Sequence, residues 1–361
     1  MQAKLAFVTG ATGLLGNNLV RALVEKGVTV RALVRSPHKA KKQFSDLPVE
    51  IIEGDMSDVS KWSSALTGCD VVFHTAAHFR DSYKGGRHWE YLQRINVQGT
   101  ADLLKFAYNQ GVRKMIHTSS IAVLARKTDG SVVDETMLRD LDGETDDYYR
   151  SKILSDQRIR EFLSEHPDMS VSMILPGFMF GPGDIGPTGS GQLILDYMSR
   201  KLPGIINTAF SVVDARDVAQ AMISAVDYGR NGELYIVAGY PLTMKEIFSR
   251  LQHITGIEAP TRYLPDWLLF VIGSVNEIYA RISGRPVLLS LATVRLIMRE
   301  RMSRNFSSAK SQRELGVKFR PVDQTFADVI AWYQEQGWLD SATITSKAST
   351  TSQLPSPEHL V

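Results

Sequence analysis

The sequence has a single cysteine and almost no net charge, and each shortage excludes a class of protein. Cys69 has no intramolecular partner, which excludes a disulfide framework and favours a reducing, cytoplasmic location. The 41 Lys and Arg residues nearly balance 39 Asp and Glu residues, and the net charge of +2 is too small to recruit nucleic acid by phosphate neutralisation. We therefore expect a small-molecule partner and no nucleic acid.

Long hydrophobic runs are also missing. The longest, Trp267 to Gly273, falls far short of the ~20 residues that a membrane-spanning helix needs, and its segment, 264–280, contains Asp266, Asn276 and Glu277. We predict no membrane span. The segment is instead predicted to be an amphipathic helix that serves as a lid, a subunit contact, part of the core or a membrane-surface contact. The opening residues, MQAKLAFVTG, do not have the pattern of a secretion signal.

The residues that are present predict an α/β fold. The chain has 361 residues, 43% of them apolar, which is enough for an extensive core. From residue 4 to about 176, six short β-branched runs alternate with helical patterns: LAFVTG, VTVRALV, VEIIEGD, DVVFHTAA, KMIHTSS and VSMILPG. Strands separated by helices predict a doubly wound parallel sheet of the Rossmann type.

A glycine-rich turn follows the first predicted strand and leads directly into a helix. Such a turn lets a pyrophosphate approach backbone N–H groups at the positive end of the helix. The combination of strand, turn and helix predicts a dinucleotide site. The residues predicted to contact the cofactor here are Thr9, Gly10, Thr12, Gly13, Leu14, Leu15 and Gly16.

The residue after the second strand favours NADP(H) over NAD(H). An enzyme that binds NAD would place an acid there to bind the ribose 2′-hydroxyl, but this sequence has Arg35. Arg35 and Lys41 or Lys42 could bracket a 2′-phosphate, or they could form a basic surface loop. After the third strand, Asp55 and Met56 could lie near the adenine, although an Asp that caps a helix would look the same.

The regular alternation ends after Pro176, in the Gly- and Pro-rich segment GFMFGPGDIGPTGSGQ. We expect an NADP-binding Rossmann domain at 1–176, to which the chain returns at about 211–240. A smaller, mainly helical C-terminal substrate domain is expected from 177–210 and 241–339. Aromatic and Met residues such as Phe178, Met179 and Trp267 indicate an apolar pocket or ordinary core. The Ser- and Thr-rich segment 340–361 is predicted to be a disordered tail.

A Tyr–Lys pair is the candidate catalytic group. Tyr148 and Lys152 are four residues apart on a predicted helix and therefore lie on one face. A nearby ammonium favours the phenolate form of tyrosine and makes it a better general acid/base. Ser119 and Ser120 follow a strand at the edge where ligands bind in such sheets. His74 and His78 are too far apart on an extended strand to share a metal, so no metal is predicted.

Taken together, these motifs resemble the extended branch of the short-chain dehydrogenase/reductase superfamily. The sequence has TGATGLLG, GDMSD, HTAAH, NVQGT, HTSS, YYRSK, LPGFMFGPGD and VVDARDVAQA in that family's order, over about residues 4 to 240. Within the branch, VRALVRSPHKAKK looks most like the dihydroflavonol-4-reductase group, in which the residues at Arg35 and Lys42 would hold the NADP phosphate. Leu175 and Phe178 depart from the residues that many members carry.

The resemblance implies roles for individual residues. Tyr148 would be the proton donor, Lys152 would lower the pKa of Tyr148 and hold the nicotinamide ribose, and Ser120 would bind the substrate oxygen. Asn96 would keep a backbone or water link behind Lys152. The cofactor would also be lined by Thr75, Ala76, Ala77, Pro176 and Gly177. Helices that flank the tyrosine commonly form dimer contacts in such proteins, so a homodimer is a possible state.

Four functions are compatible with these residues. The first is an NADPH-dependent reductase of a ketone or aldehyde, with an apolar carbonyl or alcohol as its small-molecule partner. The second is a 3β-hydroxysteroid-type dehydrogenase that runs toward the ketone. The third is an NAD-dependent nucleotide-sugar epimerase, against which Arg35 argues. The fourth, a non-catalytic NADP sensor, is disfavoured because Tyr148, Lys152 and Ser120 are all present.

Overall fold

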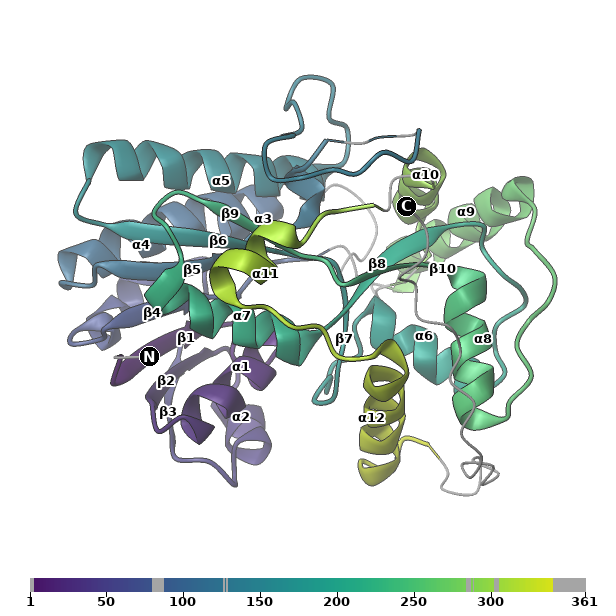
Figure 1. Cartoon of the computed structure of the whole chain (residues 1–361), viewed down its shortest axis with the longest axis horizontal. Coiled ribbons are helices and arrows are strands. Elements are labelled where there is room, and N and C mark those ends of the chain that lie inside the picture. The colour runs from purple at the N-terminus through teal and green to yellow at the C-terminus, as the bar shows by residue number, and fades with distance from the viewer. Residues whose placement is uncertain are drawn as a thin grey trace.

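The computed structural model describes residues 3–79, 88–125, 127, 129–283, 287, 289–301 and 305–339. The predicted disordered tail, 340–361, lies outside the described residues. The described chain forms a seven-stranded parallel sheet and a three-stranded sheet, with helices packed around both (Figure 1). The predicted α/β fold of the Rossmann type, with a helical C-terminal region, is confirmed.

The large sheet has the strand order β3-β2-β1-β4-β5-β6-β9. Its strands are β1 (Leu5–Thr9), β2 (Thr29–Val34), β3 (Val49–Glu53), β4 (Val71–His74), β5 (Lys114–Thr118), β6 (Ser170–Pro176) and β9 (Leu234–Val237). The first six coincide with the six predicted strands, and all seven are parallel. The order reverses between β1 and β4, and ligands bind at the carboxyl ends of strands at such a switch point.

Helices cover both faces of this sheet because alternate residues of each strand pack into different cores. In β1, Ala6 and Val8 belong to a buried cluster with α1 and α7, whereas Phe7 belongs to one with α4 and α5. The elements between the strands are α1 (Leu14–Glu25), α2 (Pro37–Gln43), η1 (Val59–Lys61), η2 (Ser63–Leu66), α3 (Trp89–Leu92), η4 (Gln93–Gln98), α4 (Gly99–Asn109), η5 (Ile121–Val123), α5 (Asp147–Glu165) and α7 (Ala215–Tyr228).

The second sheet has the order β10-β8-β7, formed by β7 (Phe178–Phe180), β8 (Ala209–Asp214) and β10 (Tyr240–Thr243). The sequence predicts that the chain returns to the Rossmann domain at about 211–240. In the structure β9 joins the large sheet and α7 packs on it, whereas β8 pairs with β7 and β10. The reason is that β8 borders two cores: Val213 packs with the α1–α7 cluster, and Val212 packs with the helical region.

The remaining helices in the C-terminal half are α6 (Gly189–Met198), α8 (Met244–Thr255), α9 (Asp266–Ser283), α10 (Leu291–Glu300), α11 (Ala309–Leu315) and α12 (Val322–Glu335). Of these, α6, α8 and α12 pack on the second sheet, α9 packs with α10, and α11 packs on α7 and β9. Phe180 of β7, Phe248 of α8 and Phe326 of α12 are fully buried in one shared cluster. Among the described helices, none combines the length and apolarity required to cross a bilayer.

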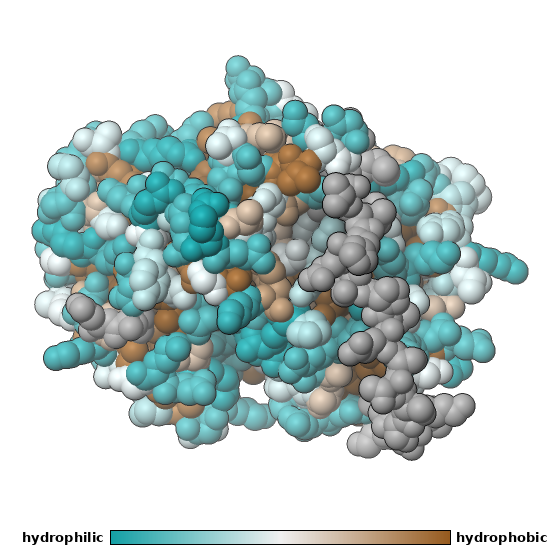
Figure 2. Space-filling view, viewed as in Figure 1, coloured by the Kyte–Doolittle hydropathy of each residue, from teal (hydrophilic) through white to brown (hydrophobic). Residues whose placement is uncertain are grey.

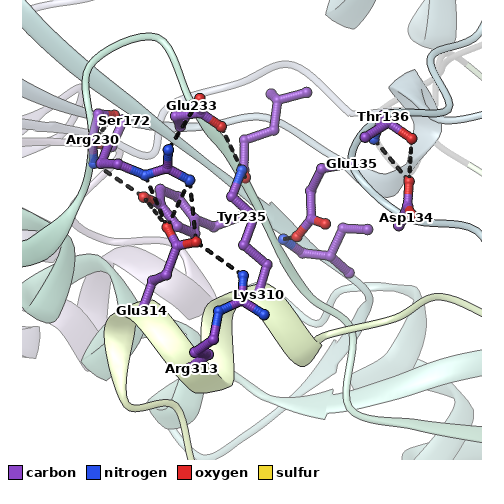
Figure 3. A network of polar contacts seen from close by, with 12 residues as sticks. Asp134, Glu135, Thr136, Ser172, Arg230, Glu233, Tyr235, Lys310, Arg313 and Glu314 are labelled. Carbon is purple, nitrogen blue, oxygen red and sulfur yellow. Dashed lines mark hydrogen bonds and ion pairs between the residues drawn. The ribbon is translucent and has the colours of Figure 1, made fainter.

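Helix α11 is fastened to β9, the edge strand of the large sheet (Figure 3). The carboxylate of Glu314 in α11 pairs with Arg230 at 3.0 Å and accepts a hydrogen bond from the Tyr235 hydroxyl at 3.1 Å. The edge amide of Ile236 donates to Glu135 Oε1 at 2.9 Å. Helix α11 thus packs against the large sheet, and the helix that follows it, α12, packs on the second sheet.

Candidate active site

The glycine-rich turn joins β1 to α1 closely. Gly10 has φ of +65°, and a Cβ there would lie 2.7 Å from the amide nitrogen of Ala76, so only glycine fits. A Cβ at Gly16 would overlap the carbonyl oxygen of Gly10. Gly13, the exposed N-cap residue of α1, is different, because a Cβ there would meet its nearest neighbour only at 3.4 Å. Open space at the positive end of a helix fits a pyrophosphate.

The segment after β4 lies directly beside this turn. The Thr75 hydroxyl donates to the carbonyl oxygen of Thr9 at 2.7 Å, and the Ala76 amide donates to Thr9 Oγ1 at 3.2 Å. The ring of His74 contacts the same hydroxyl at 2.8 Å. Thr75 and Ala76 are half-buried and Ala77 is exposed, so this segment borders the carboxyl end of β1, where the cofactor is predicted.

The two predicted phosphate-binding residues lie on the surface near the turn. Arg35 follows β2 directly, and Lys42 lies in the last turn of α2; both are exposed. Burial, with smaller contributions from the charges of His88 and Arg35, lowers the pKa of His78 in the segment after β4. The contact that α2 makes with the glycine-rich turn comes from Gln43, whose Nε2 donates to Thr12 O at 3.4 Å. Gln43 was not predicted, since no cofactor motif includes it.

Asp55 and Met56 lie between β3 and the short helices that follow it. Asp55 Oδ1 accepts a hydrogen bond from the Ser57 amide at 2.8 Å, two residues further on, and therefore holds a local turn. The side chain is half-buried, whereas Met56 is buried. Asp55 thus has a structural role through Oδ1, and a ligand could still bind its Oδ2.

Pro176 and Gly177 mark the point where the chain leaves the large sheet. The Gly177 amide donates to Val237 O of β9 at 3.1 Å. A Cβ at Gly177 would overlap the carbonyl oxygen of Ser211 in β8. Gly177 therefore lets the chain that follows β6 pass closely between β9 of the large sheet and β8 of the second sheet.

Lys152 and Ser120 lie together at the carboxyl end of β5. Buried Lys152 donates from Nζ to Thr118 O at 2.9 Å, two residues before Ser120. Burial lowers the pKa of Lys152 to about 8, although the nearby carboxylate of Asp156 opposes the shift. The two serines differ: Ser119 is buried and donates to Asp156 Oδ2 at 2.7 Å, whereas Ser120 is half-buried. Ser120 is thus the serine that a substrate can reach.

Tyr148 lies on the same face of α5, one turn before Lys152. Its side chain is buried in a small cluster with Ala122, two residues after Ser120, and with Leu296 of α10. The ring of Phe79 meets the Tyr148 ring edge-on, with the centroids 4.6 Å apart. Phe79, whose ring makes this contact, is itself 36% exposed. Sequence reasoning did not identify Phe79.

Asn96 braces the first turns of α5. It lies in η4, a π-helical turn of the kind that often occurs at functional sites. Asn96 Nδ2 donates to His78 O and to Ser151 Oγ, both at 3.0 Å, and Oδ1 accepts from the His78 amide at 2.7 Å. Ser151 in turn donates to Tyr148 O at 2.7 Å. Asn96 thus joins the segment after β4 to the helix that carries both Tyr148 and Lys152.

A buried polar cluster lies behind Lys152. Asp156, one turn further along α5, is 1% exposed, and its carboxylate binds Ser119 and lies 3.6 Å from His117 Nε2. The His117 ring lies 5.1 Å from that of His74, and burial lowers the pKa of both rings. Burial thus favours the neutral form of both rings, which lie with Asp156 in the interior next to the helix that carries Lys152. The four-residue spacing from Lys152 to Asp156 could have revealed this pair from the sequence.

A sequence model of the NAD dependent epimerase/dehydratase family matches residues 6–238. Together with the fold, this match shows a Rossmann enzyme of the oxidoreductase or epimerase type that uses a nicotinamide cofactor. The chain belongs to this family, which confirms the resemblance to the extended short-chain dehydrogenases/reductases and to dihydroflavonol 4-reductases.

Relatives with similar sequences extend over nearly the whole chain. A putative dihydroflavonol 4-reductase of Synechocystis is 32% identical over 92% of this chain and 95% of its own length. The sterol demethylase protein B of Methylococcus capsulatus is also 32% identical, over 92% of this chain and 99% of its own. The crystal structure of gox2253 superposes with a TM-score of 0.78 at 32% identity and covers 93% of this chain and 99% of that one.

Solved structures with lower identity share the fold and contain different nicotinamide cofactors. A yeast methylglyoxal/isovaleraldehyde reductase complexed with NADPH has a TM-score of 0.70 at 20% identity, and covers 93% of this chain and all of that one. A UDP-glucuronic acid 4-epimerase from Bacillus cereus with NAD has a TM-score of 0.73 at 18% identity, and covers 92% and 99%. The choice between NAD and NADP in this chain therefore rests on its own residues.

Proposed function

We propose that the protein is an NADPH-dependent reductase of a ketone or aldehyde. The observation that carries the proposal is the placement of Lys152, whose buried Nζ binds Thr118 O at the end of β5, beside Ser120 and one helical turn from Tyr148. Arg35, at the end of β2, supports NADP(H) over NAD(H). The relatives named as reductases support the direction of the reaction.

The proposed chemistry is a hydride transfer coupled to a proton transfer. A nicotinamide cofactor, held by the glycine-rich turn and the segment after β4, would supply the hydride that reduces the carbonyl carbon. Tyr148 donates its phenolic proton to the carbonyl oxygen, so that the carbonyl and one hydride plus one proton become an alcohol. Ser120 donates a hydrogen bond to the same oxygen, and the ammonium of Lys152 stabilises the phenolate that Tyr148 leaves behind.

Asn96 is proposed to position this set rather than to contact the substrate. Its amide holds Ser151 and the His78 backbone at once, so it fixes the start of α5 against the segment after β4. A rigid helix is needed because a general acid must lie within hydrogen-bond reach of its proton acceptor. Thr75, Ala76, Ala77, Pro176 and Gly177 are proposed to line the nicotinamide half of the cofactor site.

The test of this proposal is cofactor titration followed by turnover. Purified protein would be titrated with NADPH and NADH, and cofactor oxidation would then be followed with aldehydes, ketones, steroids and nucleotide sugars. NADPH-linked reduction of an aldehyde or ketone is the expected result. Tightly retained NAD with interconversion of nucleotide sugars would instead establish the epimerase alternative.

Arg35→Ala is expected to weaken NADPH binding by about 10- to 100-fold while leaving NADH binding unchanged. The reason is the loss of one charge-assisted hydrogen bond to the 2′-phosphate, which contributes about 1.5–3 kcal/mol. Dissociation constants from fluorescence titration would show the change. The control is Lys26→Ala, which removes an exposed positive charge at the C-terminal end of α1, away from the glycine-rich turn. Equal weakening of both cofactors by Arg35→Ala would count against a phosphate contact.

The reduction rate is expected to fall at alkaline pH, where Lys152 loses its proton. Asp156→Asn is expected to move this fall to lower pH. The Asp156 carboxylate raises the pKa of Lys152, against the burial that lowers it to about 8. Without the carboxylate, Lys152 loses its proton at lower pH, and the ammonium that activates Tyr148 is lost sooner. Profiles of kcat/KM against pH would show the shift. The matched control, Glu161→Gln, removes an exposed carboxylate from the same helix and should leave the profile in place.

A hydroxysteroid-type dehydrogenase is the second candidate. It is favoured by the 32% identity to sterol demethylase protein B over nearly the full length of both chains. The same residues serve this reaction in reverse, because Tyr148 as phenolate can accept the proton of an alcohol. Initial rates with a sterol and NADP+, set against rates with its ketone and NADPH, would decide between the two directions.

A further inference from the structure

His74 is a buried histidine that the proposed chemistry does not use. It ends β4, next to β1, and is 1% exposed. The face of the molecule in Figure 2 is mostly hydrophilic, and polar side chains there can bind water. A buried imidazole has to form its hydrogen bonds inside the fold instead. The partners of His74 therefore indicate what its ring does.

Each ring nitrogen of His74 contacts the hydroxyl of one buried threonine. Nδ1 lies 2.8 Å from Oγ1 of Thr9, the residue that ends β1 and leads into the glycine-rich turn. Nε2 lies 3.0 Å from Oγ1 of Thr100 in α4. Both threonines are at most 1% exposed. His74 thus connects the strand that carries the cofactor-binding turn with a helix on one face of the large sheet.

The other partners of the two threonines decide which ring nitrogen carries the proton. Thr100 donates its hydroxyl proton to Asn96 O at 2.7 Å, so its oxygen has to accept from Nε2–H of His74. The Thr9 hydroxyl accepts from the Ala76 amide at 3.2 Å and donates to Nδ1. The ring is therefore a neutral imidazole. Burial, the largest cause, lowers the pKa of His74 well below its ordinary value, which favours this neutral form.

These hydrogen bonds close a ring that joins the cofactor-binding turn to η4. The segment after β4 is held at Ala76 by the Thr9 hydroxyl and at His78 by the Asn96 side chain. Asn96 also accepts the hydroxyl proton of the α4 threonine on its backbone oxygen. His74 closes the ring, since its two nitrogens join the two threonine hydroxyls. A shift of the turn is therefore transmitted to Asn96 by two routes.

We propose that His74 is a positioning residue that keeps the cofactor-binding turn aligned with the helix that carries Tyr148 and Lys152. The ring binds the turn through Nδ1 and, through Nε2 and the α4 hydroxyl, the backbone of Asn96. Asn96 in turn holds the start of α5 through Ser151. Hydride transfer needs the nicotinamide and the proton donor aligned on one carbonyl, and a misplacement of about 1 Å can cost about 10²-fold in rate. The inference rests on the proposed function, because the aligned groups are those of that reaction.

Variants of His74 and of Thr100 test this role. His74→Phe removes both hydrogen bonds but keeps a planar ring, and we expect kcat for carbonyl reduction to fall by about 10- to 100-fold. Thr100→Val removes one of the links with little change of shape and should also lower kcat. His74→Gln keeps an amide donor where Nε2 lies and should recover part of the rate. The number of NADPH sites, counted by fluorescence titration, should stay at that of the original protein.

The matched control is Thr255→Val. Thr255 of α8 and Thr100 are both at most 1% exposed, and each hydroxyl donates to the carbonyl oxygen four residues earlier at 2.7 Å. Thr100 also accepts from His74, whereas Thr255 also accepts from the nearby Ile257 amide. Thr255→Val should therefore lower the thermal unfolding temperature much as Thr100→Val does, but leave kcat unchanged.

Turnover per bound cofactor separates positioning from folding. The inference would be overturned if kcat per NADPH site in His74→Phe or Thr100→Val stayed within about threefold of the original value, since the loss would then lie in the folded fraction. An equal loss of kcat in Thr255→Val would overturn it as well, and so would a His74→Gln rate no higher than that of His74→Phe. Failure of the proposed function looks different, because the original protein itself would then not reduce carbonyls. If it interconverted nucleotide sugars, the same variants would be compared by that rate, which needs the nicotinamide aligned with Tyr148 as well.

Discussion

Replacing Tyr148 with phenylalanine is expected to lower kcat/KM for carbonyl reduction by about 10²- to 10⁴-fold. The change removes one oxygen atom and with it the proposed proton donor, while the ring stays in its cluster with Ala122 and Leu296 and against the edge of Phe79. NADPH affinity should change little, because the glycine-rich turn and Arg35 are untouched. Steady-state kinetics and cofactor titration on the same preparation would measure both.

The matched control for this variant is Tyr149→Phe. Tyr149 is as buried as Tyr148, but its hydroxyl donates to Glu300 Oε2 at 2.6 Å and so serves the packing of α5 against α10. Its loss should lower stability modestly, by about 1–2 kcal/mol, and leave turnover within a few-fold of the original. If Tyr148→Phe retained full turnover, or if Tyr149→Phe lost as much, Tyr148 would not be the proton donor.

The features that the sequence predicts well are those decided within a few neighbouring residues. The turn from Thr9 to Gly16 is recognisable because Gly10 and Gly16 meet backbone that no side chain can share. The six strands up to Pro176 are recognisable because buried parallel strands are continuous apolar runs. The choice of Ser120 over Ser119 came from the family resemblance, and the exposures of the two serines give it a physical basis.

The features that the sequence did not predict depend on partners far along the chain. The sequence of β8 would suit a strand of either sheet. Only its pairing with Phe178 of β7 and Tyr240 of β10 shows that it belongs to the second sheet. Gln43 reaches Thr12 across 31 residues, and Ser119 reaches Asp156 across 37. The exposure of α9 also depends on a partner later in the chain. The sequence of this helix has apolar residues on two faces, and only the packing of α10 determines which face is buried.

Lys152→Met is expected to lower kcat/KM for reduction by about 10²- to 10³-fold, since it removes the charge that stabilises the phenolate of Tyr148. The pH profile should change as well. In the original protein the rate should fall as pH rises through about 8, where Lys152 loses its proton. The residual rate of the variant should not show that fall. A Lys114→Met control removes the lysine that begins β5, at the opposite end of the strand from Thr118. Lys114 binds Ser170 and Gly229, and its loss should keep the profile.

Stability distinguishes a catalytic role of Lys152 from a structural one. Lys152 binds its proton less tightly in the folded chain, with a pKa of about 8, than at its ordinary value of 10.5. Its contribution to the free energy of unfolding is therefore fully present above pH 10.5 and is lost as pH falls through about 8. At pH 7 the buried ammonium destabilises the fold by a few kcal/mol at most, at about 1.4 kcal/mol per pKa unit. Lys152→Met should thus unfold at an equal or higher temperature at pH 7 while turnover collapses. A lower melting temperature together with the lost turnover would mean that Lys152 holds the fold rather than the proton donor.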